Sequence, residues 1–234
     1  MRQVVFDLET TGFKFSEGHR IVEIGAIELM NGAITGRGFH VYINPQRDMP
    51  EGAFRVHGLS AKFLSDKVLF ADPSAGPAFI EFIGDAELIA HNGKFFDLPF
   101  LNAELSHAGL EPLTNELMDT LLFARKKFPG APASLDALCS RFGIDTKERE
   151  RDGHGALLDS KLLAEVYVEL TGGVQADLGL MRGDQSSAQK KGSTKIGNAK
   201  QRPQKIAPLL TNQERRAHEA FLTEMDGEAL WLQS

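Results

Sequence analysis

The sequence is poor in cysteine and tryptophan, with one residue of each. A single thiol excludes an internal disulfide framework and a zinc site built from several cysteines. No run reaches the roughly 18 apolar residues that a membrane-spanning helix needs, so we expect a cytoplasmic protein. Basic residues are also in deficit, since the net charge is -6. This deficit argues against a generic polycationic nucleic-acid binder, but not against an enzyme that holds DNA through metal ions.

The first 173 residues have the pattern of an α/β fold. Residues 3–9, 20–32 and 38–45 favour strands, and the turn signal Asn31-Gly32 indicates an antiparallel meander. Residues 87–92 are a short apolar run consistent with a buried strand. Helical spacing recurs in five later segments: 77–85, 98–109, 118–128, 134–143 and 156–171. Strands first, and then strands interleaved with helices, predict a mixed β-sheet flanked by helices.

The composition changes after Gly173. Residues 181–207 contain almost no large apolar side chains and are rich in Gln, Ser, Gly and Lys, so we expect a flexible linker. Residues 208–234 regain helical apolar spacing, and Thr211 with Glu214 has the spacing of a capping box. Because a lone helix of about 15 residues is marginal in water, we expect this helical tail to dock on a partner.

Two carboxylates stand out near the start of the chain. Residues two apart on a strand face the same way, so Asp7 and Glu9 share one face while Val4, Phe6 and Leu8 point into the core. Neighbouring carboxylates repel and need a cation or a proton, and their oxygens suit Mg²⁺ or Mn²⁺. Taken alone, however, a pair of this kind is more often a solvated strand face.

Three further residues change this interpretation. Asp97 follows the expected strand at 87–92 and opens a helix, where an acid alone is usually explained by the helix dipole. Asp159 lies beside the apolar stripe of the last helix of the body, and His154 precedes that helix on a glycine-flanked loop. Alone, each is more often an ordinary surface residue. Together, four carboxylates and one mobile histidine match a two-metal phosphodiesterase in which His154 takes the proton from the attacking water.

Six motifs occur in order across residues 1–173: VVFDLETTG, HVYINP, FRVHGL, LIAHNGKFFD, RKKFPGAPASLDALCSRFGID and HGALLDSKLLAEVYVELTGG. On these motifs the chain resembles the DEDDh 3′–5′ exonuclease superfamily and, within it, the proofreading (epsilon) subunits of bacterial DNA polymerase III. The resemblance implies an RNase H-like fold, two Mg²⁺ or Mn²⁺ ions, and release of 5′-monophosphates from DNA 3′ ends. It assigns Asp7, Glu9, Asp97 and Asp159 to the metal ions and His154 to the general base.

The same resemblance implies contacts with the substrate. Besides Asp7, Glu9 and Asp159, it brings Thr10 and Thr11 near the terminal nucleotide, and it lets His57 line the site for that nucleotide. Relatives often carry an acid near Gly52, and whether the adjacent Glu51 replaces it stays open. A mispaired 3′ end costs less to unpair than a paired one, so fraying would select single-stranded or mispaired DNA ends with little readout of bases.

The C-terminal segments resemble peptides that bind partners. One peptide resembles the segments that bind the sliding clamp, through Gln175, Leu178 and Leu180. The tail resembles the part that binds the polymerase III alpha subunit, through Phe221, Leu230 and Trp231. We therefore expect four parts: an exonuclease domain (1–173), a clamp-binding peptide (174–180), a flexible linker (181–207) and an alpha-subunit-binding tail (208–234).

Two other functions remain open at this point. The same five residues would serve a free-standing exoribonuclease or a nuclease for small oligonucleotides, although the linker and the Trp-bearing tail argue against such a compact enzyme. A purely structural brace for the polymerase needs no chemistry, and the five intact positions argue against it as the sole role.

Overall fold

The computed structural model describes residues 1–172 and 211–224. The chain divides into two units, Met1–Arg182 and Gly183–Ser234. The expected linker, the clamp-binding peptide with Gln175, Leu178 and Leu180, and the tail residues Leu230 and Trp231 lie outside the described residues. Within the described part, no helix is long and apolar enough to cross a membrane.

The first unit is built on a five-stranded sheet in the order β3-β2-β1-β4-β5. The strands are β1 (Arg2–Thr10), β2 (Ile21–Met30), β3 (Ala33–Tyr42), β4 (Glu87–Ala90) and β5 (Leu117–Asp119). The first three form the predicted antiparallel meander, and β4 and β5 run parallel to β1. Asn31 (φ 52°) and Gly32 (φ 78°) both take left-handed conformations at the β2–β3 turn, which explains this residue pair. The prediction of a mixed sheet is confirmed.

The helix predicted over 118–128 is wrong at its start. Residues Leu117–Asp119 form β5, and α5 (Thr120–Lys127) begins only afterwards. Asp119 ends the strand and caps the helix, because its carboxylate accepts the N–H groups of Leu121 and Leu122 at 3.0 and 3.2 Å. A three-residue strand is too short for its alternation to be recognised in the sequence.

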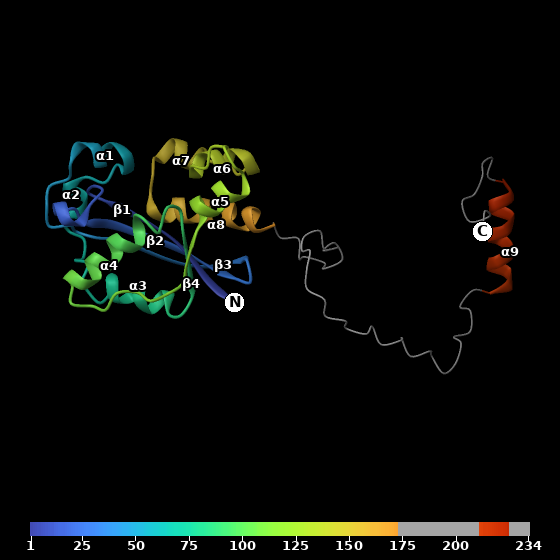
Figure 1. The fold of residues 1–234 in the computed structure, drawn as a ribbon, viewed down its shortest axis with the longest axis horizontal. Helices are drawn as coiled ribbons and strands as arrows, with labels where there is room; N and C mark the ends of the chain where they lie inside the picture. Colours follow the sequence, from blue (N-terminus) through green and yellow to red (C-terminus); the bar gives the residue numbers. More distant parts are fainter. Residues whose placement is uncertain (173–210, 225–234) are drawn as a thin grey trace, which may run out of the picture. The chain divides into compact units, whose positions relative to one another are not determined.

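Helices cover both faces of the sheet (Figure 1). On one side lie α3 (Gly76–Ile83) and α4 (Asp97–His107), and on the other α5, α6 (Leu135–Phe142) and α8 (Ala156–Thr171). The predicted ends of α6 are confirmed: Ser134 Oγ accepts the Ala137 N–H at 3.3 Å, and Gly143 closes the helix at φ 70°.

Short helical segments complete the first unit, and the sequence patterns did not predict them. They are a 3-10 turn (Phe15–Glu17), α1 (Glu51–His57), α2 (Ala61–Leu64) and α7 (Lys147–Asp152). In the second unit, α9 spans Asn212–Glu224. The predicted capping box is confirmed there, because Glu214 N–H donates to Thr211 Oγ1 at 3.2 Å and Thr211 N–H donates to the Glu214 carboxylate at 2.8 Å.

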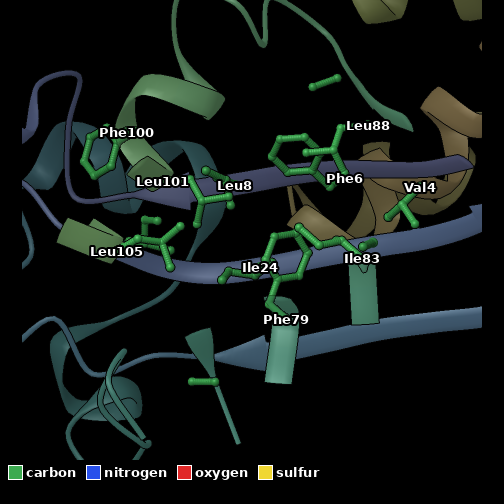
Figure 2. Close-up of a cluster of buried hydrophobic side chains, with 14 of the residues drawn as sticks. Val4, Phe6, Leu8, Ile24, Phe79, Ile83, Leu88, Phe100, Leu101 and Leu105 are labelled. Carbon is green, nitrogen blue, oxygen red and sulfur yellow. The ribbon is translucent and has the colours of Figure 1, made fainter. Parts of the chain in front are cut away.

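The central strand β1 is covered on both faces. As predicted, Val4, Phe6 and Leu8 point into the main apolar cluster, against residues of α3 and α4 (Figure 2). Val5 points to the opposite face, where Leu163 of α8 packs. Burying each such side chain contributes about 1.5–3 kcal/mol, so both helical layers are held firmly against this strand. Asp7 and Glu9 share the face with Val5, so the acids lie on a covered face of the sheet and not on a solvated one.

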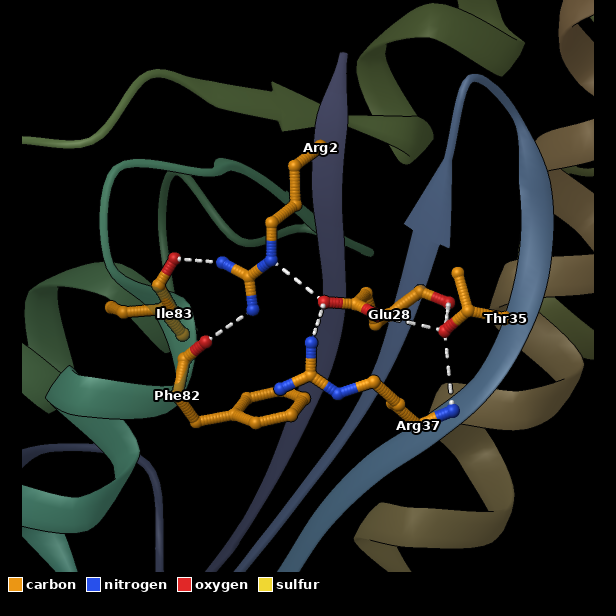
Figure 3. Close-up of polar contacts among 6 residues, drawn as sticks. All are labelled: Arg2, Glu28, Thr35, Arg37, Phe82 and Ile83. Carbon is orange, nitrogen blue, oxygen red and sulfur yellow. Dashed lines mark hydrogen bonds and ion pairs between the residues drawn. The ribbon is translucent and has the colours of Figure 1, made fainter.

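A charged cluster links the N-terminal end of β1 to β2, β3 and α3. The Arg2 guanidinium donates to Glu28 at 2.7 Å and to the carbonyl groups of Ile83 and Phe82 (Figure 3). Arg37 and Thr35 donate to the same Glu28 carboxylate at 3.0 and 2.8 Å. The carboxylate is buried but fully engaged, and these hydrogen bonds hold its pKa below the ordinary range.

Candidate active site

The four predicted acids converge beyond the carboxyl end of the parallel pair β1–β4. Pairing of β1 with β4 ends at Val5, so Asp7 and Glu9 extend past β4. Asp97 is the first residue of α4, and Asp159 lies in the first turn of α8. His154 lies on the loop between α7 and α8. Asp7, His154 and Asp159 line one cavity of about 630 Å³.

A close contact between β2 and α8 places Asp159. A Cβ atom on Gly25 would lie 2.1 Å from the nitrogen of Leu157 and 2.2 Å from the carbonyl carbon of Ala156, so only glycine fits. The buried hydroxyl of Ser160 donates to the Gly25 carbonyl at 2.8 Å and closes the contact. The first turn of α8 is therefore fixed against the sheet, and Asp159, which is 5% exposed, is fixed with it.

Asp119 places Asp97, and the sequence patterns did not single it out. Besides capping α5, its buried carboxylate accepts the N–H groups of Asn92 and Lys94 at 3.3 and 3.1 Å. These bonds fix the turn between β4 and α4, where Asn92 takes a left-handed conformation at φ 67°. His91 joins this support through a contact of 2.9 Å between its Nδ1 and Thr120 Oγ1.

Burial raises the pKa of all four acids, and repulsion within the cluster adds to the shift at Asp7 and Glu9. Burial, reinforced by Asp97 and Glu9, raises the pKa of Asp7 well above its ordinary value. Burial, with Asp159 adding repulsion, raises the pKa of Glu9 to about 8, and burial raises the pKa of Asp97 to about 7. The pKa of Asp159 is raised by burial although Arg149 and His154 oppose the shift. The ionised cluster is therefore short of positive charge.

The residues present fit a divalent cation. Glu9, His154 and Asp159 each offer a ligand atom, and these atoms lie within 4.8 Å of one another. Among the described residues, buried Asp159 Oδ1 has no partner in hydrogen-bond geometry, although Arg149 Nε lies 2.7 Å away, so this oxygen keeps capacity to coordinate a cation. Carboxylate oxygens are preferred ligands of Mg²⁺ and Mn²⁺, and imidazole joins them at many transition-metal sites. Asp7 and Asp97 add charge to the same cluster.

Arg149 occupies part of this site, and the sequence patterns did not reveal it. Its Nε lies 2.7 Å from Asp159 Oδ1, and its Nη2 lies 3.0 Å from Asp159 Oδ2. The same Nη2 lies 2.7 Å from His154 Nδ1. In the sequence, Arg149 belongs to the charged run KERERD, which is indistinguishable from a solvated surface helix. Only the placement of α7 beside α8 shows its partner.

A mostly apolar cavity of about 480 Å³ adjoins Glu9. It is lined by the three residues that the sequence assigned to the terminal nucleotide: Thr10, Thr11 and His57. Both hydroxyls are engaged internally, since Thr10 donates to the Gly12 carbonyl at 2.7 Å and Thr11 accepts the Arg20 N–H at 3.0 Å. Both threonine hydroxyls therefore already have partners within the chain.

His57 differs from the two threonines, because its buried Nε2 has no partner in strict hydrogen-bond geometry within the described part of the chain, although the Thr10 backbone acts on the ring. Its Nδ1 accepts the Leu59 N–H at 3.0 Å, and burial lowers the pKa of the imidazole. The neutral ring thus carries its proton on the buried Nε2. Glu51, whose role the sequence left open, is exposed and pairs with Arg55, whereas Gly52 lines the cavity.

Comparison with known proteins agrees with this geometry. The family model of the RNase_T exonucleases matches residues 4–167. The DNA polymerase III subunit epsilon of Rickettsia felis is 47% identical over 230 residues, which cover 96% of this chain and 97% of the relative. The subunit of the same name from Escherichia coli K12 is 41% identical over 242 residues, covering 98% and 97%. The chain belongs to the exonuclease family.

The activity of the chain is therefore that of a 3′–5′ exonuclease, in the proofreading role of polymerase III epsilon subunits. Solved structures share the fold. Exonuclease X in complex with 5′ overhanging duplex DNA has a TM-score of 0.55 at 21% identity, over 72% of this chain and 90% of that chain. The zinc-bound complex of E. coli exonuclease I with single-stranded DNA has a TM-score of 0.61 at 18% identity, over 73% and 41%. This fold family depends on divalent metal ions.

Proposed function

We propose that this exonuclease removes mispaired 3′-terminal nucleotides from DNA, with two Mg²⁺ or Mn²⁺ ions held by Asp7, Glu9, Asp97 and Asp159. The observation that carries the proposal is the convergence of four acids with raised pKa values at one end of the sheet. Unpaired buried charge is costly, so such a cluster persists when function requires a cation there.

Each residue has a distinct task in this proposal. Asp7, Glu9 and Asp159 hold the ions directly, and Asp97 contributes the fourth acid. Once bound, the ions would supply the positive charge that eases deprotonation of water and stabilises the leaving oxygen. His154 takes the water proton on an imidazole nitrogen. The water oxygen bonds to phosphorus, the bond to the 3′ oxygen breaks with its electron pair, and a 5′-monophosphate leaves.

The position of His154 supports its task as the general base. Its side chain is 42% exposed, and it is flanked by Gly153, at φ 84°, and Gly155. A partly exposed imidazole between two glycines is able to turn toward water while its backbone stays attached to α8. Its Nδ1 lies 3.2 Å from Asp159 Oδ2, which places the base beside a proposed metal ligand.

The cavity next to Glu9 supports selection of mispaired ends. Its lining is largely apolar and includes Val56 and Phe96 beside Thr10 and Thr11. Such a surface accepts the faces of any base and reads no base edge. A nucleotide must leave its stack to enter, and a mispaired or single-stranded 3′ end pays the smaller unstacking cost. The preference for mispaired ends therefore comes from how easily the DNA 3′ end unpairs.

The relatives are polymerase III subunits, which supports the remaining proposals about partners. The tail 208–234 binds the polymerase alpha subunit, with Phe221, 60% exposed on α9, as one apolar anchor beside Leu230 and Trp231. The peptide 174–180 binds the sliding clamp, and residues 181–207 tether the two modules in the cytoplasm. Deletion of 208–234 is expected to abolish co-purification with the alpha subunit and to leave hydrolysis of single strands unchanged.

An exonuclease assay tests the catalytic proposal. The substrates are 5′-labelled single-stranded DNA, mispaired duplex, paired duplex and RNA, each with Mg²⁺ or Mn²⁺, and the proteins are the unaltered chain, Asp7→Asn and His154→Ala. We expect stepwise shortening of single-stranded and mispaired DNA, lost in both variants. Preference for RNA would contradict the substrate proposed, and full activity of His154→Ala would contradict the general base.

A further inference from the structure

Arg149 is the residue of the site whose position the reaction does not explain. It extends from α7, and its side chain is only 9% exposed. Its guanidinium contacts three acceptors from three different elements: Asp136 of α6, His154 of the loop and Asp159 of α8. A surface helix of charged residues needs no such burial, so the position of this side chain is not explained by the stability of α7 alone.

The guanidinium occupies the groups that the reaction needs. Its Nε and Nη2 cover both carboxylate oxygens of Asp159, at 2.7 and 3.0 Å. Nη2 also points at His154 Nδ1 at 2.7 Å and engages a lone pair that a general base requires free. A divalent cation and this guanidinium compete for Asp159, because both are positive and both use the same two carboxylate oxygens.

The contact is not fully bonded, which makes it replaceable. Arg149 Nε and Asp159 Oδ1 lie 2.7 Å apart, yet neither buried atom has a partner in hydrogen-bond geometry. The buried pair of Arg20 and Glu104 contrasts with this, since two bonds of 2.8 Å join guanidinium and carboxylate. A divalent ion on Asp159 therefore replaces one aligned bond, from Nη2 to Oδ2 at 3.0 Å, and a contact at Oδ1 that charge alone holds.

A displaced guanidinium would remain beside the substrate. Arg149 lines the cavity of about 630 Å³ together with Asp7 and Asp159, so a strand that occupies this cavity lies beside it. The planar fork that fits a carboxylate also fits a phosphate. Asp136, exposed on the far side of the guanidinium, keeps the side chain near the cavity by accepting from Nη1.

We propose that Arg149 is a substrate-positioning residue that closes the metal-free site on Asp159 and His154, yields to the incoming cation, and then binds a phosphate of the DNA strand. The inference rests on the proposed function, since it takes Asp159 as a metal ligand. The alternative is a purely structural role, in which the Arg149 side chain only anchors α7 and stays in place when metal and DNA bind.

Metal binding without DNA tests the first half. Mn²⁺ is titrated calorimetrically into the full chain, Arg149→Gln and Lys147→Gln. The Lys147 control removes the same charge from the same helix, but at an exposed position that pairs only with Asp145 among the contacts described for it. If the closed arrangement outweighs the open one about tenfold, Arg149→Gln binds Mn²⁺ about tenfold more tightly, since apparent affinity scales with the competent fraction. Lys147→Gln is expected to match the unaltered chain.

DNA binding tests the second half. Anisotropy of a labelled single strand is measured with Ca²⁺ across a range of salt concentrations, and gels confirm that the strand stays intact. A lost phosphate contact weakens binding and lowers the slope of log affinity against log salt by about 0.7 for a single strand. A merely structural role leaves that slope where Lys147→Gln has it.

The outcomes separate the proposals. Unchanged Mn²⁺ affinity in Arg149→Gln overturns the competition, and an unchanged salt slope overturns the phosphate contact. Equal Mn²⁺ binding by Asp159→Asn and the unaltered chain instead contradicts the proposed function itself. If Arg149→Gln melts at a lower temperature, Arg149→Lys takes its place. Lysine keeps the charge but lacks the fork, so it tests the competition alone: we expect tighter Mn²⁺ binding, and unchanged Mn²⁺ affinity would overturn the competition.

Discussion

Glu28 and Asp159 are both buried acids that contact arginine, and they differ in how completely they are bonded. Glu28 accepts from Arg2, Thr35 and Arg37, and its pKa lies below the ordinary range (Figure 3). Asp159 faces Arg149, yet Oδ1 has no aligned partner and burial raises its pKa. Glu28, which joins strands, thus has all its hydrogen bonds made within the fold. Asp159, which we assign to a cation, keeps an oxygen without an aligned hydrogen bond.

The same contrast extends along β1. At its N-terminal end, Arg2 ties the strand to α3 and β2, and the acid nearby is neutralised by the fold itself. At its C-terminal end, Asp7 and Glu9 meet further acids, and Arg149 is the one basic residue among those described that opposes the pKa shift of Glu9. The first end contributes stability, whereas the second end costs stability until a cation binds. Four substitutions test this contrast, from the largest expected effect to the smallest.

Asp7→Asn is expected to abolish function and spare the fold. Loss of one proposed metal ligand should lower exonuclease activity by about a thousandfold or more, or ~4 kcal/mol in activation free energy. Removing one charge from a repelling cluster should raise the melting temperature in EDTA at pH 8. Steady-state kinetics and thermal unfolding measure the two effects. A lower melting temperature with retained activity would show that Asp7, like Glu28, stabilises the fold and does not serve the reaction.

Glu9→Gln tests the cost of the acidic end through pH. The pKa of Glu9 is raised to about 8, so the folded state binds more protons than the unfolded chain between about pH 4.5 and 8. The stability of the metal-free chain should therefore fall as pH rises through that window, and stay level above it. Glu9→Gln lacks this pH-dependent loss. Its free energy of unfolding, measured in urea, should therefore exceed that of the unaltered chain by a few kcal/mol at pH 8. Saturating Mn²⁺ should reverse the order.

Glu28→Gln tests the bonded end of β1. The amide keeps the shape but loses the charge, which weakens its bonds with Arg2 and Arg37. We expect a loss of about 2–3 kcal/mol in unfolding free energy, with unchanged activity per folded molecule. Urea unfolding and kinetics at low temperature check this. Loss of activity ahead of unfolding would mean that the two ends of the strand are coupled.

Asp119 combines a structural role like that of Glu28 with support for the proposed metal site, and Asp119→Ala tests both. It removes the cap of α5 and the bonds to Asn92 and Lys94. The expected loss of stability is about 1–2 kcal/mol, together with weaker Mn²⁺ binding because the turn that carries Asp97 loosens. Ser134→Ala removes only the cap of α6 and serves as the control. Equal Mn²⁺ binding by both variants would leave Asp119 as a cap alone.

Local patterns predicted much of this fold and of its candidate site. The alternation of β1 identified the face of Asp7 and Glu9, and the glycine-flanked loop placed His154 ahead of α8. Patterns failed where an element is short or its partner is distant. β5 has three residues, and α7 reads as a solvated charged helix although Arg149 is buried. The roles of the five residues remain predictions for the experiments above.

The sequence by itself determined the antiparallel meander, the buried strand β4 and the five longer helices of the first unit, because strand and helix periods and turn residues act over a few positions. Its motifs, through the family resemblance, also identified the acids that converge. Only the tertiary structure decided that Asp7 and Glu9 lie on a covered face, that Asp119 holds the turn before Asp97, and that Arg149 faces Asp159. These contacts join segments far apart in the chain. Their burial and charge exist only once the helices pack on the sheet, and that packing raises the pKa values of the acids and creates the need for a cation.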